Sequence, residues 1–376
     1  MAAGSRRWIA AGAAIAALLA GAAAFPPAPR RAPRDTAPLA TPSPAGDRVG
    51  VSADPIFLDP GSIQRSLAQL RANGIHWLRE TFYWGMLEPH PGKFSWRRSD
   101  AVMTAAARNG VDVVAILAYS APWAATQPHA SDAQHYPPKR LSDYAAYAAA
   151  VTRRYGPGGS FWSSHRRLPN HPLAAVEIWN EPWWHGFWRP IANPIAYARL
   201  VRAAGASIRR VARHLPILVS ADLDQTGRGG EPWIQQLLAV TPSIAPYVDI
   251  WSVHPYPDPK SLGPEQGDVS SSFQRVPVIE RLVTDAGVNR PLWITEIGWS
   301  SANASEGVSE SDQARFLSQA LADALTTWQS FVGRIFIYTW DRDGRDPSDL
   351  QQHFGLLRAN GQPKPALAAV ATATGG

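Results

Sequence analysis

One unit repeats eight times along this chain: a short β-branched run, a loop and a stretch with helical spacing. The eight runs are Arg48–Ser52, Ile75–Thr81, Val111–Ala118, Ala174–Asn180, Ile217–Ala221, Val248–His254, Leu292–Glu296 and Arg334–Tyr338. The helical stretches are Ser62–Asn73, Ser99–Asn109, Ser142–Tyr155, Pro194–His214, Pro232–Val240, Ser272–Ala286 and Glu310–Trp328, with a last helix starting near Pro363. Strict alternation predicts an α/β fold with parallel strands and right-handed crossovers.

Eight units favour a closed (β/α)8 barrel, the TIM barrel, over an open doubly wound sheet. No glycine-rich phosphate loop follows the first run, where the sequence reads Asp54-Pro55-Ile56-Phe57. The unusual residues cluster directly after the runs, which is the functional rim of such a barrel. No internal sequence repeat indicates a solenoid or a propeller.

The N-terminal part of the chain is expected to lie outside this fold. Residues 1–24 carry two early arginines and an Ala-rich apolar run, and they are typical of a signal peptide. The alternative is an uncleaved N-terminal membrane anchor. The Pro-rich residues 25–46 predict a disordered tether, and residues 47–376 predict one catalytic domain. Either reading of the first segment predicts a secreted or cell-surface protein.

Composition excludes several classes of partner and chemistry. Of the net charge of +6, six arginines and two aspartates up to Arg48 account for +4, so no basic stripe remains for nucleic acid. The absence of cysteine excludes thiolate metal sites and thiol catalysis. The 16 tryptophans suit stacking on sugar rings, although most tryptophans fill cores.

Two of the expected strands end in a glutamate, Glu181 after the fourth and Glu296 after the seventh. Period-2 alternation places Leu292, Ile294 and Glu296 on one inward face, apolar until it reaches the carboxylate. Strands four and seven lie roughly opposite each other across an eight-stranded barrel, so the two glutamates can converge. Paired carboxyls are what glycoside hydrolysis requires. The alternative is that one of them forms a salt bridge at the rim.

The residues around both glutamates resemble clan A of the retaining glycoside hydrolases. The matching motifs are Asn180-Glu181-Pro182, Thr295-Glu296 and Gly298-Trp299, and the likeness runs from about Val49 to Leu367. This resemblance implies double displacement, with Glu296 as nucleophile and Glu181 as acid and then base. Asn180 is implied to bind the 2-hydroxyl of the sugar. Retention requires carboxyl groups only about 5 Å apart.

Other strand ends fit the same clan residue by residue. Arg79 resembles the arginine that keeps the nucleophile ionised, although it could instead pair with Glu80 or Glu88. His254 and Tyr256 resemble the pair after strand six, in which the tyrosine typically hydrogen-bonds the nucleophile. His254 could also be a satisfied core histidine.

Trp340 resembles the aromatic platform beneath the sugar, with Trp340–Asp341 as a candidate non-proline cis bond; packing alone is the alternative. Glu177 lies on the same face as Glu181, deeper in the strand. We interpret it as a buried structural acid paired with an arginine, the alternative being a third catalytic carboxyl.

Within the clan, the chain resembles family 39 more than family 5. Family 5 usually has a histidine after strand three, where this chain reads Ala118-Tyr119-Ser120-Ala121-Pro122-Trp123. The segments Trp84–Trp96 and His353–Leu356 are also closer to family 39. The substrate does not follow from this resemblance.

Aromatic residues after the strands are candidate sugar-binding residues, and we expect about half to contact substrate. They are Tyr83, Trp84, Tyr119, Trp123, Trp183, Trp184, Trp188, Trp233 and Trp299. His129 and His135 share one loop, but their spacing matches no metal-ligand motif, so neither metal nor cofactor is expected. The expected partner is an oligo- or polysaccharide, bound by a monomer that has no nucleic acid partner and meets a membrane only through an uncleaved N-terminus.

Two other functions use the same motifs. A carbohydrate-binding barrel without catalysis would keep the aromatic residues but could lose a glutamate, and both are present here. A transglycosylase shares every residue named above. A barrel enzyme of another class, such as an aldolase, needs a lysine or a metal cluster at the strand ends, and neither is found there.

Overall fold

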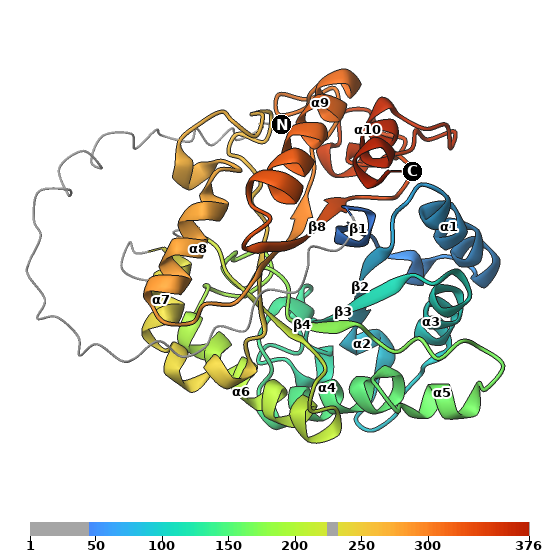
Figure 1. Cartoon of the computed structure of the whole chain (residues 1–376). Coiled ribbons are helices and arrows are strands. Elements are labelled where there is room, and N and C mark those ends of the chain that lie inside the picture. The colour runs from blue at the N-terminus through green and yellow to red at the C-terminus, as the bar shows by residue number, and fades with distance from the viewer. Residues whose placement is uncertain (1–44, 224–231, 376) are drawn as a thin grey trace, which may run out of the picture. The chain divides into compact units, whose positions relative to one another are not determined.

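The strands form the predicted barrel. The computed structural model describes residues 45–223 and 232–375, in which eight parallel strands close in the order β1 to β8, with β8 beside β1. The strands are β1 Val49–Ser52, β2 Trp77–Tyr83, β3 Asp112–Ala118, β4 Ala175–Ile178, β5 Ile217–Ser220, β6 Ile250–Val253, β7 Leu292–Ile297 and β8 Val332–Tyr338. The (β/α)8 prediction is confirmed, and the helices surround the strands (Figure 1).

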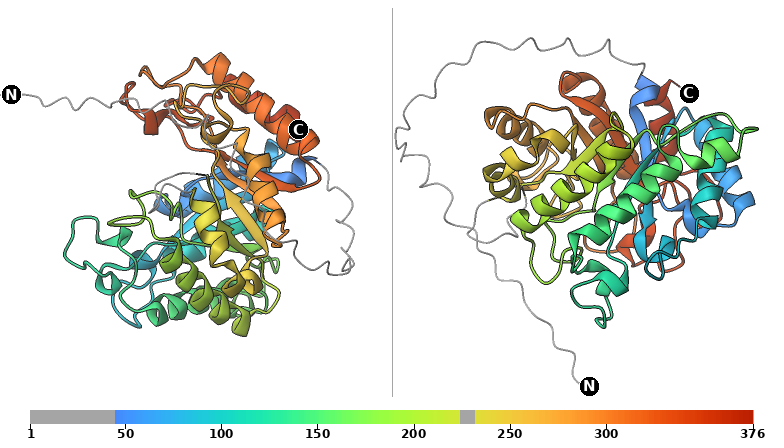
Figure 2. Two further views of the ribbon diagram at one scale, coloured as in Figure 1. Left: turned by 90° about the vertical axis from the view of Figure 1, so that its left-hand side faces the viewer. Right: turned by 90° about the horizontal axis from the view of Figure 1, so that it is seen from below.

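A helix follows each of the expected runs. The long helices are α1 Pro60–Ala72, α3 Arg97–Asn109, α4 Leu141–Tyr155, α6 Pro194–Val211, α7 Trp233–Ala239, α8 Arg275–Asp285, α9 Glu310–Ala322 and α10 Pro365–Thr374. Two short helices, α2 Trp84–Leu87 and α5 Ser160–Ser164, were not expected. Helices α4 and α6 lie side by side, as seen from below in Figure 2.

Local signals in the sequence explain where several of these helices begin and end. Asp59 and Asn193 each precede a proline and accept a hydrogen bond from a backbone N–H of the first turn, so they cap α1 and α6. Gly110 ends α3 in the left-handed conformation, at φ 63°. Within the described ranges, no helix is both long and apolar enough to cross a membrane.

The predicted leader and tether lie almost wholly outside the described residues. Of the tether, only Ala45 and Gly46 are described, and they form a short 3-10 helix with Asp47 and Arg48. The guanidinium of Arg48 donates to backbone carbonyls of residues 324, 325, 332 and 333, which ties the start of the fold to β8.

The barrel interior is layered. At the amino end of the strands, one side chain from most strands points inward and is apolar: Trp77, Val114, Ala175, Leu218, Ile250, Trp293 and Phe336. At the same level, strand β1 has Gly50. A side chain does not fit there, because a Cβ would lie 2.5 Å from the ring of Phe336. Two residues further along the strands the interior becomes polar, with Ser52, Arg79, Glu177 and Ser252 hydrogen-bonded to one another.

The prediction that Leu292 and Ile294 share the inward face of β7 with Glu296 is wrong. Leu292 and Ile294 pack in the large core cluster shared with the helices, whereas Trp293 lies in the inner cluster. The register between β7 and β8 shifts between Ile294 and Ile297, where β7 holds one extra residue. This bulge changes which side chains face inward, so Glu296 reaches the barrel centre despite the alternation that precedes it.

Candidate active site

Arg79 on β2 organises the polar centre of the barrel. It is fully buried, and its Nε donates to Glu177 Oε2 at 2.6 Å. Nη1 donates to Ser52 Oγ at 3.0 Å and to Glu296 Oε1, and Nη2 donates to Asn180 Oδ1 at 2.8 Å. Burial alone lowers the pKa of Arg79, but the charges of Glu177 and Glu296 outweigh it and raise the pKa. Arg79 is therefore a permanent buried cation.

Glu177 has the structural role that the sequence indicated. It is fully buried, pairs with Arg79 and accepts a second hydrogen bond from Ser252 Oγ at 2.8 Å. The alternative partners of Arg79 are excluded by geometry. Glu88 accepts from Trp84 Nε1 at 2.6 Å and from the backbone N–H of Gly92 at 2.7 Å.

Glu80, the neighbour of Arg79, is a buried carboxyl that sequence reasoning did not single out. No lysine or arginine of the described chain pairs with it. Burial raises its pKa well above the ordinary value, and the nearby Asp54 and Asp341 raise it further. Neither of its carboxyl oxygens has a hydrogen-bond partner among the described residues. The surroundings of Glu80 therefore favour its neutral form more than water does.

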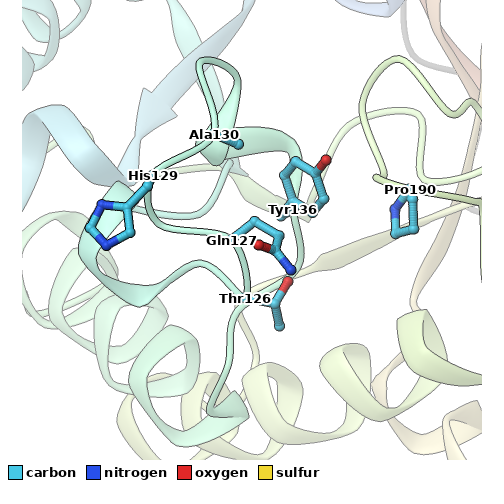
Figure 3. A pocket seen from close by; sticks show the side chains of 6 residues that line it. All are labelled: Thr126, Gln127, His129, Ala130, Tyr136 and Pro190. Carbon is cyan, nitrogen blue, oxygen red and sulfur yellow. The ribbon is translucent and has the colours of Figure 1, made fainter.

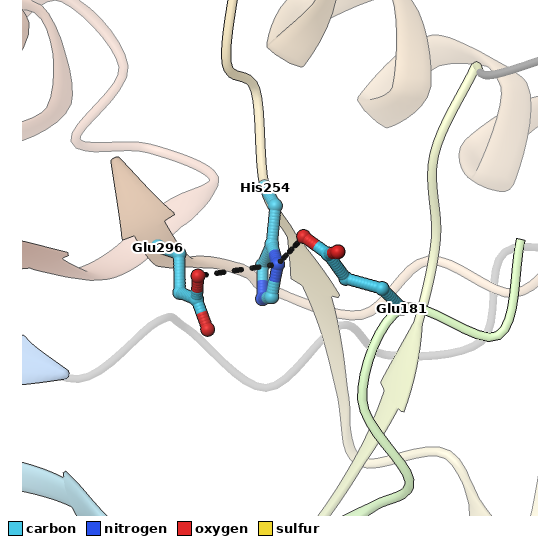
Figure 4. Close-up of side chains that lie close together, drawn as sticks. All are labelled: Glu181, His254 and Glu296. Atoms are coloured by element: carbon cyan, nitrogen blue, oxygen red, sulfur yellow. Dashed lines mark hydrogen bonds and ion pairs between the residues drawn. The ribbon is translucent and has the colours of Figure 1, made fainter. Parts of the chain in front are cut away.

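Glu181, His254 and Glu296 meet at the carboxyl ends of β4, β6 and β7 (Figure 4). His254 Nδ1 lies 2.8 Å from Glu181 Oε1 and 3.8 Å from Glu296 Oε2. One ligand atom of each residue lies within 4.8 Å of the others. Tyr256 donates its hydroxyl to Glu296 Oε2 at 3.2 Å, as the resemblance implied. The two predicted catalytic carboxylates therefore face each other across one histidine.

The ionisation of His254 and Tyr256 follows from these neighbours. Burial lowers the pKa of His254, but the charge of Glu296 and the hydrogen bond to Glu181 outweigh burial and raise the pKa above its usual value. Burial and then the charge of Glu296 raise the pKa of Tyr256, so its hydroxyl remains a donor. His254 is not merely a satisfied core histidine, because its partner is Glu181.

The backbone after β4 is strained. The strand ends at Ile178, two residues before its predicted end, and Trp179 and Glu181 have positive φ angles of 65° and 44°. Side chains with a Cβ rarely adopt these angles, and such residues cluster at functional sites. Trp179 is held by a hydrogen bond from its indole N–H to the carbonyl of Phe187 at 2.9 Å.

The platform role predicted for Trp340 stays a prediction. Its indole N–H donates to Ser66 Oγ on α1 at 2.9 Å, so the ring packs against that helix. The cis bond in this segment is Tyr338–Thr339, and not Trp340–Asp341. Tyr338 is the residue beside the site, with its ring 6.5 Å from that of Tyr256 and its pKa raised by burial and by Glu296.

Tyr338 could have been found from the sequence. It lies two residues after Phe336, which points into the barrel. Period-2 counting along β8 therefore places Tyr338 on the inner face at the carboxyl end, where the substrate-facing side chains of a barrel lie. Trp340 lies beyond the end of the strand, so the same counting does not apply to it.

Four of the aromatic candidates keep an accessible position. Tyr119 accepts a hydrogen bond from Asn180 Nδ2 at 3.1 Å and stacks on Phe187. Tyr83 and Trp123 are half-buried, while 41% of the surface of Trp184 is exposed. A contact between these residues and a sugar stays a prediction.

Four of the remaining tryptophan candidates are corrected, because their rings lie inside the protein. Trp84 is fully buried and stacks on Tyr147. Trp299 is fully buried, and its indole N–H donates to the carbonyl of Leu262 at 2.7 Å. Buried in the same way are Trp183, Trp188 and Trp233. Four of these rings therefore offer almost no face to a sugar, whereas Trp183 is 5% exposed and lies 5.5 Å from the ring of His254, so its contact with a sugar stays a prediction.

Glu181, His254 and Glu296 are also the one group of described residues with metal-ligand spacing. Glu296 is already bonded to the cation of Arg79, which opposes a second positive charge at that oxygen. His129 and His135 do not belong to such a group in the described chain. The expectation that the protein needs no metal stays a prediction.

Residues 192–369 match the family model of the glycosyl hydrolase catalytic core. The matched part is somewhat less than half of the chain, and it supports a glycoside hydrolase. The matched part contains Glu296 and His254, while Glu181 and Arg79 precede it. A search of curated proteins found no match.

Solved structures with the same fold include both families that the sequence resembles. A family 39 glycoside hydrolase from Bacteroides cellulosilyticus WH2 is 19% identical with a TM-score of 0.65, and the match covers 88% of this chain and 64% of that one. A GH5_18 protein from Streptomyces cattleya, bound to Manb1-4GlcNAc, is 20% identical (TM-score 0.59, coverage 88% and 80%). An endo-1,4-beta-mannanase from Rhizomucor miehei is 13% identical (TM-score 0.59, coverage 87% and 94%). The glycoside hydrolase recognition is confirmed.

Proposed function

We propose that this protein is a retaining β-glycosidase that hydrolyses O-glycosidic bonds of an extracellular oligo- or polysaccharide. One observation carries the proposal: oxygens of Glu181 and Glu296 lie within 4.8 Å of each other. Retaining enzymes hold their two carboxyl groups about 5–5.5 Å apart, whereas inverting enzymes need about 6.5–9.5 Å to admit a water molecule.

The contacts of the two glutamates favour unequal roles. Glu296 is bound by Arg79 and Tyr256, two groups that stabilise its charged form, so it is the nucleophile that attacks the anomeric carbon. Glu181 has no cationic partner besides the titratable His254 among the described residues. It donates its proton to the leaving oxygen and then takes a proton from the water that releases the sugar from Glu296.

The sugar at the cleavage site is placed by groups beside this pair. Asn180 is fixed by Arg79 through its oxygen and bonds Tyr119 through its nitrogen, at the position where a 2-hydroxyl would lie. Tyr338 offers a ring beside Glu296. Because proteins of this fold include a xylanase and mannan-degrading enzymes, β-1,4-linked xylo- and manno-oligosaccharides are the first substrates to test.

The decisive test follows the anomer of the first product by proton NMR. Wild type should release the β-anomer first from an aryl β-glycoside, and a 2-deoxy-2-fluoro glycoside should label Glu296, which peptide mass spectrometry detects. Glu296→Gln should lose more than about 10⁴-fold in kcat while the exposed Glu265→Gln control stays active. Initial release of the α-anomer, or label on another residue, contradicts the retaining assignment.

We also infer that residues 1–24 direct export, as their composition indicates. Mass spectrometry of the protein recovered from its native host tests this, since cleavage after the Ala-rich run removes the first 24 residues. A chain that starts at Met1 and stays in the membrane fraction indicates the uncleaved anchor. Product analysis with an added acceptor sugar separates hydrolysis from transglycosylation.

A further inference from the structure

A cavity lies between the loop after β3 and the loop after β4. It has a volume of about 520 Å³ and is lined by Thr126, Gln127, His129, Ala130, Tyr136 and Pro190 (Figure 3). We call it the rim pocket. Its volume falls within the range of about 300–1,000 Å³ typical of small-molecule sites. None of its lining residues takes part in the catalytic network described above.

The walls of the rim pocket are held by the backbone. Thr126 donates its backbone N–H to the carbonyl of Pro137 at 3.0 Å, which closes the loop on itself. Arg189 joins the two loops, because its backbone N–H donates to the carbonyl of His135 at 2.8 Å and its side chain pairs with Asp132 at 2.9 Å. A pocket with fixed walls loses little conformational entropy when a ligand binds.

The chemistry of the lining suits a neutral sugar. Thr126, Gln127 and Tyr136 present hydroxyl and amide groups, and no hydrogen bond occupies these side chains within residues 45–223 and 232–375. Figure 3 shows Thr126 and Gln127 on one side of the Tyr136 ring and Pro190 on the other. No carboxylate, lysine or arginine lines the pocket, and His129 is the only titratable side chain besides Tyr136 among its lining residues. An aromatic face with several uncharged donors and acceptors matches a pyranose ring and its hydroxyl groups.

A chain of ring contacts joins the rim pocket to the catalytic centre. The His135 ring lies next to Tyr136 in sequence and contacts the rings of Tyr119 and Phe187, at 4.9 Å and 5.4 Å. Tyr119 bonds Asn180, the neighbour of Glu181. The exposed ring of Trp184 packs against Phe187 at 4.9 Å. These four rings, Tyr119, His135, Phe187 and Trp184, form an aromatic wall that lies next to the pocket in the loops after β3 and β4.

We infer that the rim pocket is a distal subsite that binds a neutral sugar residue in the leaving-group part of an oligosaccharide. This inference rests on the proposed function, because Glu181 protonates the leaving oxygen and stands on the same loop as Pro190. The sugars beyond the cleaved bond leave the centre on the Glu181 side, toward the aromatic wall. The substrate class is accordingly a neutral chain of several sugar units, and not a short glycoside.

The first experiment measures kcat/KM for 4-nitrophenyl β-glycosides and for β-1,4-linked manno-, xylo- and gluco-oligosaccharides of two to six units. The double variant Gln127→Ala/Tyr136→Ala removes two polar groups and a ring. The ratio of kcat/KM for the best hexasaccharide to that for the aryl glycoside should fall by about 10- to 100-fold. Tyr136→Phe keeps the ring and should lose less. The matched control Gln69→Ala changes an exposed residue of helix α1 and should leave the ratio unchanged.

A binding experiment keeps this inference separate from catalysis. Calorimetry with the three hexasaccharides compares Glu296→Gln with the triple variant that also carries Gln127→Ala and Tyr136→Ala. The Kd of the best hexasaccharide should be about 10- to 100-fold higher for the triple variant. Equal Kd values with and without the two substitutions overturn the subsite. So does a wild type whose kcat/KM does not rise with chain length. Failure of wild type to hydrolyse any glycoside counts against the proposed function instead, while the binding result still decides the subsite.

Discussion

Two arginines lie at opposite ends of the same barrel, and their surroundings differ in kind. Arg79, toward the carboxyl end, donates to two carboxylates, an amide and a hydroxyl, all of them side-chain oxygens. The guanidinium of Arg334, toward the amino end, lies over two rings instead, 3.8 Å from the centroid of Trp77 and 4.4 Å from that of Trp293. One end compensates charge and the other covers an apolar layer.

The pKa values of the two arginines move in opposite directions for this reason. Carboxylates beside Arg79 overcome burial and raise its pKa, whereas burial lowers the pKa of Arg334 to about 10. Only at the carboxyl end does the arginine touch a residue that can react with substrate. The amino end therefore covers an apolar layer, and the carboxyl end places buried positive charge beside Glu296, the nucleophile of the proposed function.

The largest effect is expected from Arg79→Met. It leaves Glu177 and Glu296 as buried negative charges without a cation, so the free energy of unfolding should fall by about 3–5 kcal/mol. The fall in kcat/KM should be at least about 10³-fold, since both Glu296 and Asn180 lose their anchor. Urea unfolding and aryl glycoside kinetics measure the two effects.

Arg79→Lys is the second variant for this position. A lysine keeps the charge but cannot present the guanidinium fork to several oxygens at once. It should recover part of the stability and little of the activity. A Met variant with near wild-type kcat/KM contradicts the view that Arg79 prepares the nucleophile.

Glu80→Gln should raise the free energy of unfolding. The variant tests the difference between Glu177, a buried carboxyl paired with a cation, and Glu80, a buried carboxyl without one among the described residues. Because the pKa of Glu80 is raised in the folded state, the folded protein binds a proton that the unfolded chain releases above about pH 4.3. Stability from this residue is thus lost as pH rises through that window. Glutamine needs no proton, so at pH 7 it should add about 1–2 kcal/mol.

The matched control for Glu80→Gln is Glu177→Gln, which removes a partner of Arg79. That variant should lower stability at pH 7, opposite in sign to Glu80→Gln, although both positions are fully buried. Denaturant unfolding at pH 5 and pH 7 compares them. Loss of stability in both variants would show that Glu80 is charged and has found a partner in solution.

The barrel and the positions of Glu181 and Glu296 at the ends of its strands were predictable because their signals are local. Each strand and helix has its own periodicity, and three consecutive residues, Asn180-Glu181-Pro182, are enough to recognise the motif around Glu181. The inward position of Glu296 was predicted for the wrong reason. It depends on a bulge in β7, which arises from pairing with β8 and leaves no trace in the alternation of β7 alone.

Exposure of aromatic residues was the least predictable property. Trp84 and Trp184 both follow strand ends, but Trp84 is enclosed by Tyr144 and Tyr147 from α4, while Trp184 stays 41% exposed. Which ring is covered depends on helices about 60 residues away in the sequence. The same limit applies to Trp340, whose partner Ser66 lies at the other end of the chain.

His254 predicts a smaller, pH-dependent effect at the carboxyl end. Its pKa is raised in the folded state, so its contribution to stability is full below the unfolded value of about 6.5 and is lost as pH rises through the folded value. His254→Gln should remove this part of the slope, about 1 kcal/mol between pH 6 and pH 9. Unfolding free energies across that range measure it, with the exposed His214→Gln as control. Parallel slopes for His254→Gln and wild type contradict the assigned partners.

The smallest effect is expected from Arg334→Met, the direct counterpart of Arg79→Met at the other end of the barrel. Methionine covers Trp77 and Trp293 with a similar apolar chain, so only the cation–π attraction is lost, at about 1 kcal/mol or less. Arg334 contacts neither Glu181 nor Glu296, and kcat/KM should equal that of wild type within about twofold. Thermal unfolding and aryl glycoside kinetics test both parts. A large fall in activity with intact stability would show that the apolar end of the barrel also positions the catalytic residues, and the division of labour between the two arginines would then be wrong.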